Sequence, residues 1–410
     1  NKIMVKKDLQ FRNDFQKNLL NLNNFKKFSL KFNDIFSNVK TDITKSNNTL
    51  HILSNKTEFN FSLKKIQKYK KKFNTIALIG MGGSILGSEA INSFLKYKIK
   101  KKVYFFDDVD TKKILLFKKK ENINKTLFIV ISKSGETIET ISNLFALKIL
   151  KKNSKNIIII SEKKNNFLYN LAKTLNLFYI EHNPYVGGRY SVLGEVGLIP
   201  GFLMGIDIRK LRSSIKTFLI SKKERSFLKD SVVKLASLKK SKNIKNIVFL
   251  NYAPEMEKFL FWCQQLIAES LGKKGKGFFP VISNVPKDHH SLLQLYLDGP
   301  KDKLFYIFSS SEKEKIKLKK NKNFQIHKYL NKKSLSFIKN AQKKALIKSF
   351  KINQISYREF IVKKNNETVL GKLFSYFILE TIIFAKLVGI NPFNQPAVEQ
   401  VKIHTKKLLS

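Results

Sequence analysis

The chain has 410 residues, 43% of them hydrophobic and 27% charged, a composition that excludes a disordered or fibrous protein and leaves room for two or three domains. A formal net charge of +49 would suit a nucleic-acid binder, but almost all of the excess is lysine. Nucleic-acid readers depend on arginine for bidentate contacts. We therefore expect lysines spread over solvated faces, weak salt-sensitive attraction to polyanions, and no specific nucleic-acid site.

Cysteine content and hydropathy bear on the compartment. The single cysteine, Cys263, excludes an internal disulfide framework and fits a reducing environment. The basic N-terminus lacks the apolar core of a signal peptide, because Asp8 and Asp14 interrupt it. The longest apolar run, residues 373–390, contains Glu380 and is typical of a buried helix, not a membrane span. These features predict a cytoplasmic protein with no membrane segment.

The order of the expected elements predicts an α/β fold. Residues 1–70 show helical periodicity without glycine and are expected to form a helical N-terminal segment. Short β-rich runs then alternate with helical stretches, which predicts βαβ units and doubly wound parallel sheets. The expected strands are 76–79, 103–106, 127–131, 157–160 and 178–180, with helices near 85–97, 111–119, 137–150 and 165–175.

A second set of elements follows the first on a similar plan. Connecting helices are expected over 206–245, then strands at 247–250, 279–282, 304–308 and 355–362, and a long helix over about 367–388. The prediction is therefore two α/β domains, at 71–205 and 206–390, followed by a C-terminal helix within 391–410.

The first segment that could carry chemistry is the glycine-rich turn Gly80–Gly87, between a buried strand and a helix. Glycines let the backbone approach a ligand, and a helix N-terminus favours an anion. A dinucleotide fingerprint is excluded, because its third glycine would fall at Ile85. On this motif alone, a purely structural turn is an equally good interpretation.

The second segment is Ser132–Thr137, Ser-Lys-Ser-Gly-Glu-Thr, again after a strand and before a helix. Three hydroxyls and several backbone N–H groups at a helix N-terminus suit a phosphate monoester, although an ordinary N-cap is the alternative. Parallel sheets gather ligands at the carboxyl ends of their strands. Two such turns on separate strands therefore favour a phosphate site.

Several blocks together resemble a known family. SKSGETIET resembles the phosphate-binding loop of the sugar isomerase (SIS) domain. With GMGGSILG, VGGRYSVLGEVGL, AESLGK, DHHSLLQLYLDG and NPFNQPAVEQVK, in family order from about residue 75 to 402, the chain resembles the phosphoglucose isomerase family in its shorter bacterial form. The first 70 residues match only loosely. The resemblance implies two SIS-type domains that interconvert glucose 6-phosphate and fructose 6-phosphate through a cis-enediol, with no metal or organic cofactor.

The resemblance also implies which residues bind the substrate. They are Gly83, Ser84, Ser132, Lys133, Ser134, Thr137 and Gln395. We expect the hydroxyls of this set to converge on the phosphate. Glu136 should point away from it, because like charges repel.

Two charged residues are candidates for the chemistry itself. Paired glycines precede Arg189 and free the backbone to aim its guanidinium into a cleft, although a surface arginine after a turn is the alternative. Glu269 lies near the C-terminal end of a helix, where the dipole disfavours a carboxylate and makes it a better base; a solvated glutamate is the alternative. The resemblance implies that Arg189 steadies the enediolate and that Glu269 moves the proton between C1 and C2.

The remaining candidates depend on the family pattern. Tandem His289 and His290 could suggest a metal, but neighbouring helical residues point about 100° apart and no second cluster accompanies them. The pattern H-x-x-x-Q-L selects His290 as the ring-opening acid/base and leaves the role of His289 open. Gln395 and Lys402 lie two helical turns apart on one face, and the family uses both for contacts to the sugar phosphate and its ring oxygen.

Two further implications complete the prediction. In the family the ring-opening histidine comes from the neighbouring subunit, which implies an obligate homodimer. One alternative is a dual phosphoglucose/phosphomannose isomerase. Another is a non-catalytic SIS sugar-phosphate sensor, but such a module would lack the Glu269, His290 and Lys402 set and usually carries a DNA-binding or regulatory domain.

Overall fold

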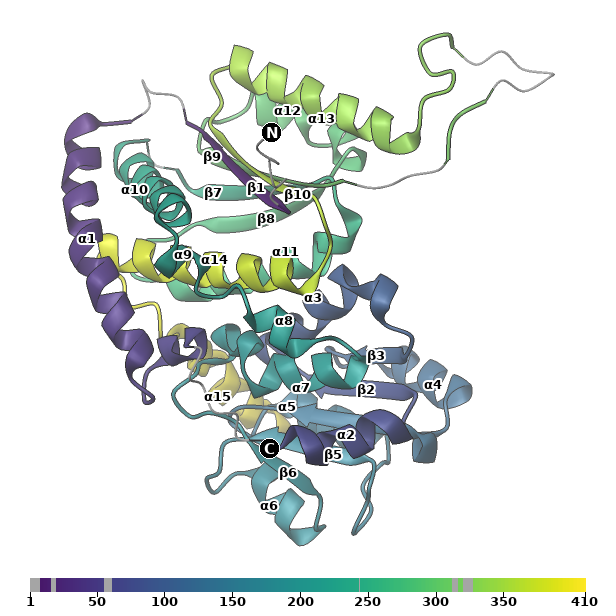
Figure 1. The fold of residues 1–410 in the computed structure, drawn as a ribbon. Helices are drawn as coiled ribbons and strands as arrows, with labels where there is room; N and C mark the ends of the chain where they lie inside the picture. Colours follow the sequence, from purple (N-terminus) through teal and green to yellow (C-terminus); the bar gives the residue numbers. More distant parts are fainter. Residues whose placement is uncertain (1–7, 16–19, 55–60, 243, 312–315, 320–326) are drawn as a thin grey trace, which may run out of the picture.

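Two separate five-stranded sheets organise the chain (Figure 1). The structure is a computed structural model that describes residues 8–15, 20–54, 61–242, 244–311, 316–319 and 327–410. All strands of the first sheet are parallel, in the order β3-β2-β4-β5-β6. The second sheet has the order β1-β10-β9-β7-β8 and is parallel except for its edge strand β1. The predicted α/β class with two doubly wound parallel sheets is confirmed.

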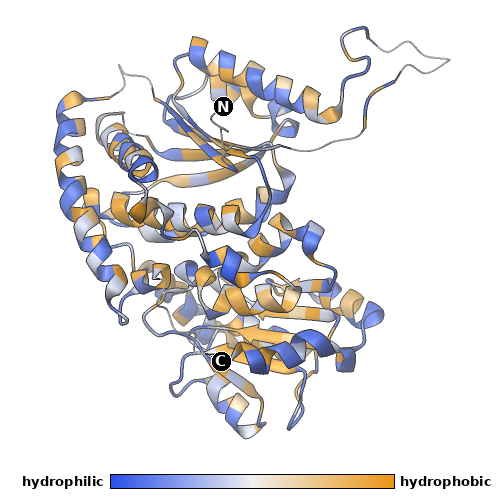
Figure 2. Ribbon diagram, in the orientation of Figure 1, coloured by the Kyte–Doolittle hydropathy of each residue, from blue (hydrophilic) through white to orange (hydrophobic). Residues whose placement is uncertain are grey.

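The elements of the first domain follow the expected alternation. Its strands are β2 (Thr75–Gly80), β3 (Lys102–Phe106), β4 (Thr126–Ile131), β5 (Ile157–Ser161) and β6 (Phe178–Glu181). Its helices are α2 (Leu63–Lys72), α3 (Leu86–Phe94), α4 (Thr111–Lys120), α5 (Ile138–Ala146), α6 (Phe167–Thr174) and α7 (Glu195–Met204). Strands β2, β4 and β5 are buried along their whole length, as parallel strands covered on both faces should be. Figure 2 shows the first sheet as a predominantly hydrophobic band.

The second domain repeats this plan. Its strands are β1 (Leu9–Asp14), β7 (Asn246–Asn251), β8 (Phe279–Asn284), β9 (Lys303–Ser310) and β10 (Tyr357–Val362). Helices α12 (Leu293–Leu297) and α13 (Leu335–Ile352) lie on one side of this sheet, and α11 (Glu257–Leu271) and α14 (Glu367–Leu387) on the other (Figure 1). The connecting helices are α8 (Ile208–Arg212), α9 (Thr217–Ile220) and α10 (Lys222–Lys242). The predicted domain boundaries stay a prediction.

The N-terminal segment departs from the expectation of an all-helical start. Helices α1 (Leu22–Thr44) and α2 agree with it, but residues 9–14 form β1, which pairs with β10. Leu9 is buried, and Phe11 stacks on Phe227 at 4.7 Å between ring centroids. Burial of this alternating face against the second domain selects the strand over the helix.

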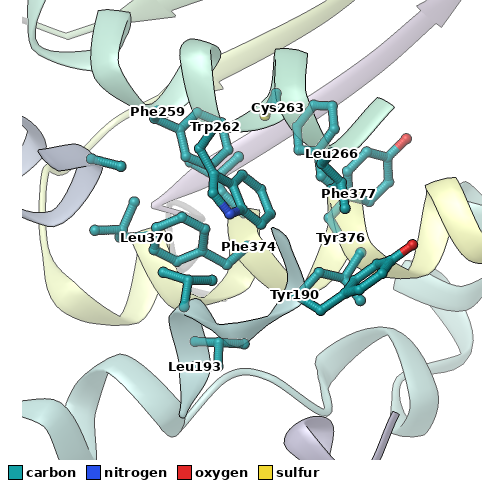
Figure 3. Packing of buried hydrophobic residues seen from close by; sticks show 14 of the residues in the cluster. Tyr190, Leu193, Phe259, Trp262, Cys263, Leu266, Leu370, Phe374, Tyr376 and Phe377 are labelled. Carbon is teal, nitrogen blue, oxygen red and sulfur yellow. The ribbon is translucent and has the colours of Figure 1, made fainter. Parts of the chain in front are cut away.

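Helix α14 is the core helix of the second domain. Among the described residues it alone is long and apolar enough to cross a membrane, yet 89% of its apolar window is buried inside the fold. Phe374 and Phe377 of α14 pack on Phe259 and Trp262 of α11, and Tyr190 lies beside this contact (Figure 3). The prediction that this apolar run is a buried helix is confirmed. The packing also fixes α11 and the segment around Tyr190, which carry two of the candidate site residues.

A buried ion pair stabilises the same core and gives a stability prediction. Arg358 of β10 is fully buried, donates to Glu380 of α14 and to the Tyr306 hydroxyl at 2.9 Å, and donates to the Ser231 carbonyl at 3.0 Å. Replacing Arg358 with Met would leave Glu380 buried without its counter-charge. We expect a loss of about 3–5 kcal/mol in the free energy of unfolding, measured by urea denaturation.

Two further variants test whether the unpaired charge of Glu380 causes that loss of stability. Arg12→Met removes an arginine whose side chain is 67% exposed, and should change stability by no more than about 0.5 kcal/mol. The double replacement of Arg358 and Glu380 by Met should recover most of the loss, because both buried charges are then gone. A double variant as unstable as Arg358→Met would contradict the assignment of the loss to the unpaired charge.

Candidate active site

Both glycine- and serine-rich turns lie at the topological switch point of the first sheet. Strands β2 and β4 are neighbours there, and Gly80 pairs with Ile131 at their carboxyl ends. A side chain on Gly80 would meet the Ile131 carbonyl at 2.9 Å and the Ser84 Cβ at 3.2 Å. The turn after β2 therefore packs directly against the end of β4. Ligands of doubly wound sheets bind at this kind of position.

The three hydroxyls of the serine-rich turn lie close together, whereas their convergence with Ser84 on a phosphate stays a prediction. The Ser132 Oγ lies 2.8 Å from the Thr137 Oγ1 and 3.4 Å from the Ser134 Oγ, in front of the first turn of α5. Gly135 has φ +69°, and a Cβ there would lie 1.8 Å from the Asn166 Oδ1, so only glycine fits. The turn thus presents a compact group of hydroxyls at a helix N-terminus, which is suited to a phosphate.

The two charged residues of this turn are directed elsewhere. The Glu136 Oε1 accepts from the backbone N–H of Phe167 at 2.6 Å, at the start of α6. Its negative charge is therefore held away from the hydroxyls, as predicted. The Lys133 Nζ donates to the Pro184 carbonyl at 2.8 Å and lies 3.4 Å from the Glu162 carboxylate. Contact between Lys133 and substrate stays a prediction.

Arg189 is the most constrained residue of the site. It lies in the 3₁₀ helix η6 (Gly188–Leu193), is 3% exposed, and its Nε donates to the Ser270 Oγ at 2.9 Å. Its Nη2 donates to the Pro392 carbonyl at 2.6 Å. Its Nη1 donates to the Glu269 Oε2 at 3.0 Å and to the Gln395 Oε1 at 2.8 Å. The structure thus brings three predicted residues together and excludes the alternative of a surface arginine.

The glycine-rich turn reaches the same place. A Cβ on Gly83 would lie 2.2 Å from the carbonyl carbon of Gly188 and 2.5 Å from the Arg189 nitrogen, so the two turns touch through their backbones. A Cβ on Gly82 would lie 2.8 Å from the Gln265 Nε2. The turn that leaves β2 therefore connects the three hydroxyls at the end of β4 with Arg189 and its side-chain partners Glu269, Ser270 and Gln395, here called the Arg189 cluster.

Glu269 occupies the last turn of α11, with its side chain 33% exposed. Its Oε1 accepts from the Gln265 Nε2 at 2.8 Å, and its Oε2 accepts from Arg189. Gln265 and Ser270 were not among the predicted site residues. The spacing of four residues on one helix face could have identified Gln265, because such side chains are neighbours.

Lys273 is a second residue that the sequence did not single out. Its Nζ donates to the Asn391 carbonyl, just before the segment that carries Gln395. Burial, and then the charge of Arg189, lower the pKa of Lys273 to about 8, while Glu269 opposes the shift. Arg189 and Lys273 together hold the chain from Asn391 to Gln395 through its carbonyls. This segment leads into the C-terminal helix α15 (Ala397–Leu409).

The structure does not bring His290 and Lys402 to this cluster within the chain. His290 is exposed in the short helix η8 (Lys287–His290), and among the described residues it forms no hydrogen bond or ion pair with Arg189 or Glu269. Its neighbour His289 contacts the Tyr252 hydroxyl at 2.9 Å through Nε2. Lys402 is exposed on α15, where its Nζ lies 2.7 Å from the Glu399 carboxylate. No three His, Cys, Asp or Glu side chains group as metal ligands in the part of the chain that the structure describes.

Solved structures share this fold. A hypothetical protein from Thermus thermophilus matches with a TM-score of 0.84 at 24% identity, over 98% of this chain and 100% of its own. A glucose-6-phosphate isomerase from Chlamydia trachomatis matches with a TM-score of 0.70 at 17% identity, over 84% of this chain and 71% of its own. These likenesses show the fold, an α/β protein with two doubly wound parallel sheets.

Sequence comparison defines the family. The family model described as phosphoglucose isomerase matches residues 33–277. The "Probable glucose-6-phosphate isomerase" of Methanococcus maripaludis is 35% identical over 82% of this chain and 79% of its own. The glucose-6-phosphate isomerase of Methanocaldococcus jannaschii is 33% identical over 82% and 85%. The chain belongs to the phosphoglucose isomerase family, which confirms the resemblance predicted from the motifs.

Proposed function

We propose that the chain is an isomerase that interconverts glucose 6-phosphate and fructose 6-phosphate through a cis-enediol, as in glycolysis and gluconeogenesis. The observation that carries the proposal is the sharing of the Arg189 Nη1 between Glu269 and Gln395, at 3.0 and 2.8 Å. It joins a candidate base to a fixed cation, and the turn that contains Gly83 links both to the three hydroxyls of the serine-rich turn. A sugar phosphate is the partner that this combination fits.

We assign the phosphate end of the substrate to the three hydroxyls of the serine-rich turn. Ser132, Ser134 and Thr137 would donate to the phosphate oxygens in place of their mutual hydrogen bonds. The N-terminus of α5 adds favourable electrostatics without a bulky arginine clamp. Ser84 and Gly83, on the adjacent turn, would close the same pocket, with Lys133 at its edge.

Glu269 is assigned as the base of the reaction. It takes the proton from C2 of the open-chain aldose, and the electron pair of that C–H bond forms the C1=C2 double bond while the carbonyl oxygen on C1 gains negative charge. The hydroxyl proton on O2 passes to O1, Glu269 returns its proton to C1, and the electron pair left on O2 forms the C2 carbonyl, which gives the ketose and restores the carboxylate. Proton transfer by a positioned carboxylate typically contributes ~10²–10⁴ in rate.

Arg189 is assigned as the electrophile. Its Nε and Nη2 are fully engaged by Ser270 and backbone carbonyls, so the guanidinium cannot reorient when substrate enters. Only Nη1 bonds to side chains that can exchange for a ligand. A fixed donor aimed at the developing oxyanion is typically worth ~10²–10³ in rate.

A homodimer with shared active sites is the proposed assembly. The chain by itself leaves His290 away from Glu269, and the ring-opening role needs both at one substrate. Helix α15, which carries Lys402, has no buried residue and exposes Val398, Val401 and Ile403. Burial of these apolar side chains against a second copy would favour association.

We assign cytoplasmic localisation, with the lone thiol of Cys263 buried in the core.

A coupled assay on glucose 6-phosphate, run in parallel with mannose 6-phosphate, tests the proposed function. We expect turnover of glucose 6-phosphate at rates typical of enzymes, on the order of 1–10³ s⁻¹. Equal turnover of mannose 6-phosphate would instead establish the dual isomerase. Binding of either sugar phosphate without turnover would establish the non-catalytic sensor and contradict the proposal.

A further inference from the structure

A cavity of about 850 Å³ lies in the second domain, between α13 and the β1–β10–β9 edge of the second sheet. It is lined by polar side chains from both α13 and the sheet, including Ser309, Lys344 and Glu359. None of the residues that line it belongs to the Arg189 cluster. Its size is within the range of small-molecule sites.

The cavity occupies the topological counterpart of the first domain's serine-rich turn. In chain order the parallel strands β7, β8, β9 and β10 are arranged like β2, β3, β4 and β5, so β9 is the equivalent of β4. The backbone N–H of Ser132, after β4, donates to the Ile160 carbonyl of β5 at 3.0 Å. The N–H of Ser311, after β9, donates to the Val362 carbonyl of β10 at 2.8 Å. Ser311 is therefore the positional equivalent of Ser132.

The two positions also share their chemistry. Strand β9 ends in Ser309 and Ser310 and is followed by Ser311, and all three residues line the cavity. Because side chains alternate along a strand, the hydroxyls of Ser309 and Ser311 lie on the face that carries α13. Ser334, the N-cap of the 18-residue helix α13, and Ser336 line it as well.

The charge of the cavity favours an anion. Among the described residues that line it, six side chains are cationic and two are carboxylates. Both carboxylates are already paired within the cavity: Glu359 with Lys343 at 2.8 Å and Asp14 with Lys351 at 3.7 Å. Lys343 is 8% exposed and also donates to the Ser309 Oγ at 3.0 Å.

Two of the lysines that line the cavity are available to bind a ligand. Lys344 and Lys363 are exposed at the cavity and have no ion-pair partner in the part of the chain that the structure describes. A single phosphate needs one cradle of hydroxyls, whereas lysines on both α13 and the sheet suit a ligand with several phosphate groups. We propose that this cavity binds a polyphosphorylated small metabolite, with its phosphates between Ser309–Ser311, the N-terminus of α13, and these lysines.

Calorimetric titration with inorganic tripolyphosphate tests the proposal on the whole enzyme. The active site is first filled with saturating fructose 6-phosphate, and the buffer contains about 0.15 M salt so that long-range attraction is screened. We expect one tripolyphosphate to bind per chain. Lys344→Glu and Lys363→Glu should each weaken binding about tenfold or more, because each replaces an attraction by a repulsion. Ser311→Ala, which leaves the charge unchanged, should also weaken it.

Lys348→Glu is the matched control. Lys348 is exposed on the same helix, one turn after Lys344, and does not line the cavity. It should change the affinity by less than about threefold, because it lies outside the site and its charge is screened. Equal losses from Lys344→Glu and Lys348→Glu would show general attraction to a basic protein and overturn the proposal, as would no binding of tripolyphosphate.

Parallel titrations identify the ligand class. Tighter binding of a nucleoside triphosphate than of tripolyphosphate would assign the cavity to nucleotides. Tighter binding of a sugar bisphosphate would assign it to phosphorylated sugars. Because the cavity is separate from the Arg189 cluster, the outcome is independent of whether Glu269 is the catalytic base.

Discussion

Replacing Glu269 with Gln is expected to lower the turnover of fructose 6-phosphate by a factor on the order of 10² or more, with little change in substrate binding. The amide keeps the shape of the side chain, and its oxygen can still accept from the Arg189 Nη1. What it loses is the ability to take a proton from carbon. Steady-state kinetics should therefore show a loss in turnover and an almost unchanged KM.

Solvent exchange gives the same variant a second and more specific readout. In the proposed reaction the proton on C2 resides on Glu269 between its two positions, so the active enzyme should exchange it with deuterated water. The Glu269→Gln enzyme should not. Exchange at near the normal rate in that variant would contradict the assignment of the base, although the fold and the phosphate site would be unaffected.

A matched control uses another glutamate of α11. Glu257, in the first turn, accepts a hydrogen bond from the Asn284 side chain at 2.6 Å, which an amide oxygen could also accept. Glu257→Gln therefore makes the same chemical change on the same helix without touching Arg189. It should retain most of the activity.

Replacing His290 should affect a different step. As the ring-opening acid/base, His290 acts before the proton transfer that Glu269 performs. A His290→Leu enzyme should turn over pyranose substrates slowly, yet should process a substrate supplied in its open-chain form. Equal losses on both kinds of substrate would contradict this division of labour.

Local signals account for what the sequence predicted well. A strand, a glycine- or serine-rich turn and a helix are close in sequence, so Gly83, Ser132 and Thr137 could be assigned to the ends of strands before any tertiary structure was known. The parallel strands of both sheets could be predicted in the same way, because parallel strands that are buried on both faces are rich in apolar residues. The helix α13 was not predicted, since its apolar residues are interrupted by lysines along most of its length.

Long-range pairing explains what the sequence missed. Strand β1 is six residues long, and its partner β10 lies about 350 residues away in the chain, a separation that no local pattern reports. Lys273 became a site residue only through its tertiary contact with Asn391, whereas the contact of Gln265 with Glu269 is local, one turn apart on α11. Lysine is so frequent here that composition could not single out Lys273.

The scarcity of arginine was a better guide than the abundance of lysine. Arg189, Arg212 and Arg358 each bind several acceptors in the interior, where a planar fork with five donors does what an ammonium cannot. Arginine scarcity predicts a fixed cation at Arg189, but it applies equally to Arg358, which stabilises the core instead. The scarcity of arginine therefore identified fixed cations. Only the residues around each arginine distinguished a candidate site, at Arg189, from the core, at Arg358.

The placement of His290 leads to the last prediction, which concerns complementation between two inactive enzymes. If His290 acts on the substrate held by the neighbouring subunit, a dimer of one Glu269→Gln chain and one His290→Leu chain contains one site with both defects and one with neither. Random mixing makes half of the dimers heterodimers, so about a quarter of the wild-type activity on pyranose substrates should return. Mixing requires subunit exchange or co-expression with two different affinity tags.

Two measurements make that outcome decisive. Sedimentation should show a dimer for each variant alone, and each should be nearly inactive on pyranose substrates. Purification through both tags isolates the heterodimer, which should then have about half of the wild-type activity per dimer, because one of its two sites is intact. If each site were built from a single chain, every site in the heterodimer would carry one defect and no activity would return. A fully active monomer would likewise exclude the shared site, whereas recovery would require that the surface bearing His290 faces the Arg189 cluster of the other subunit.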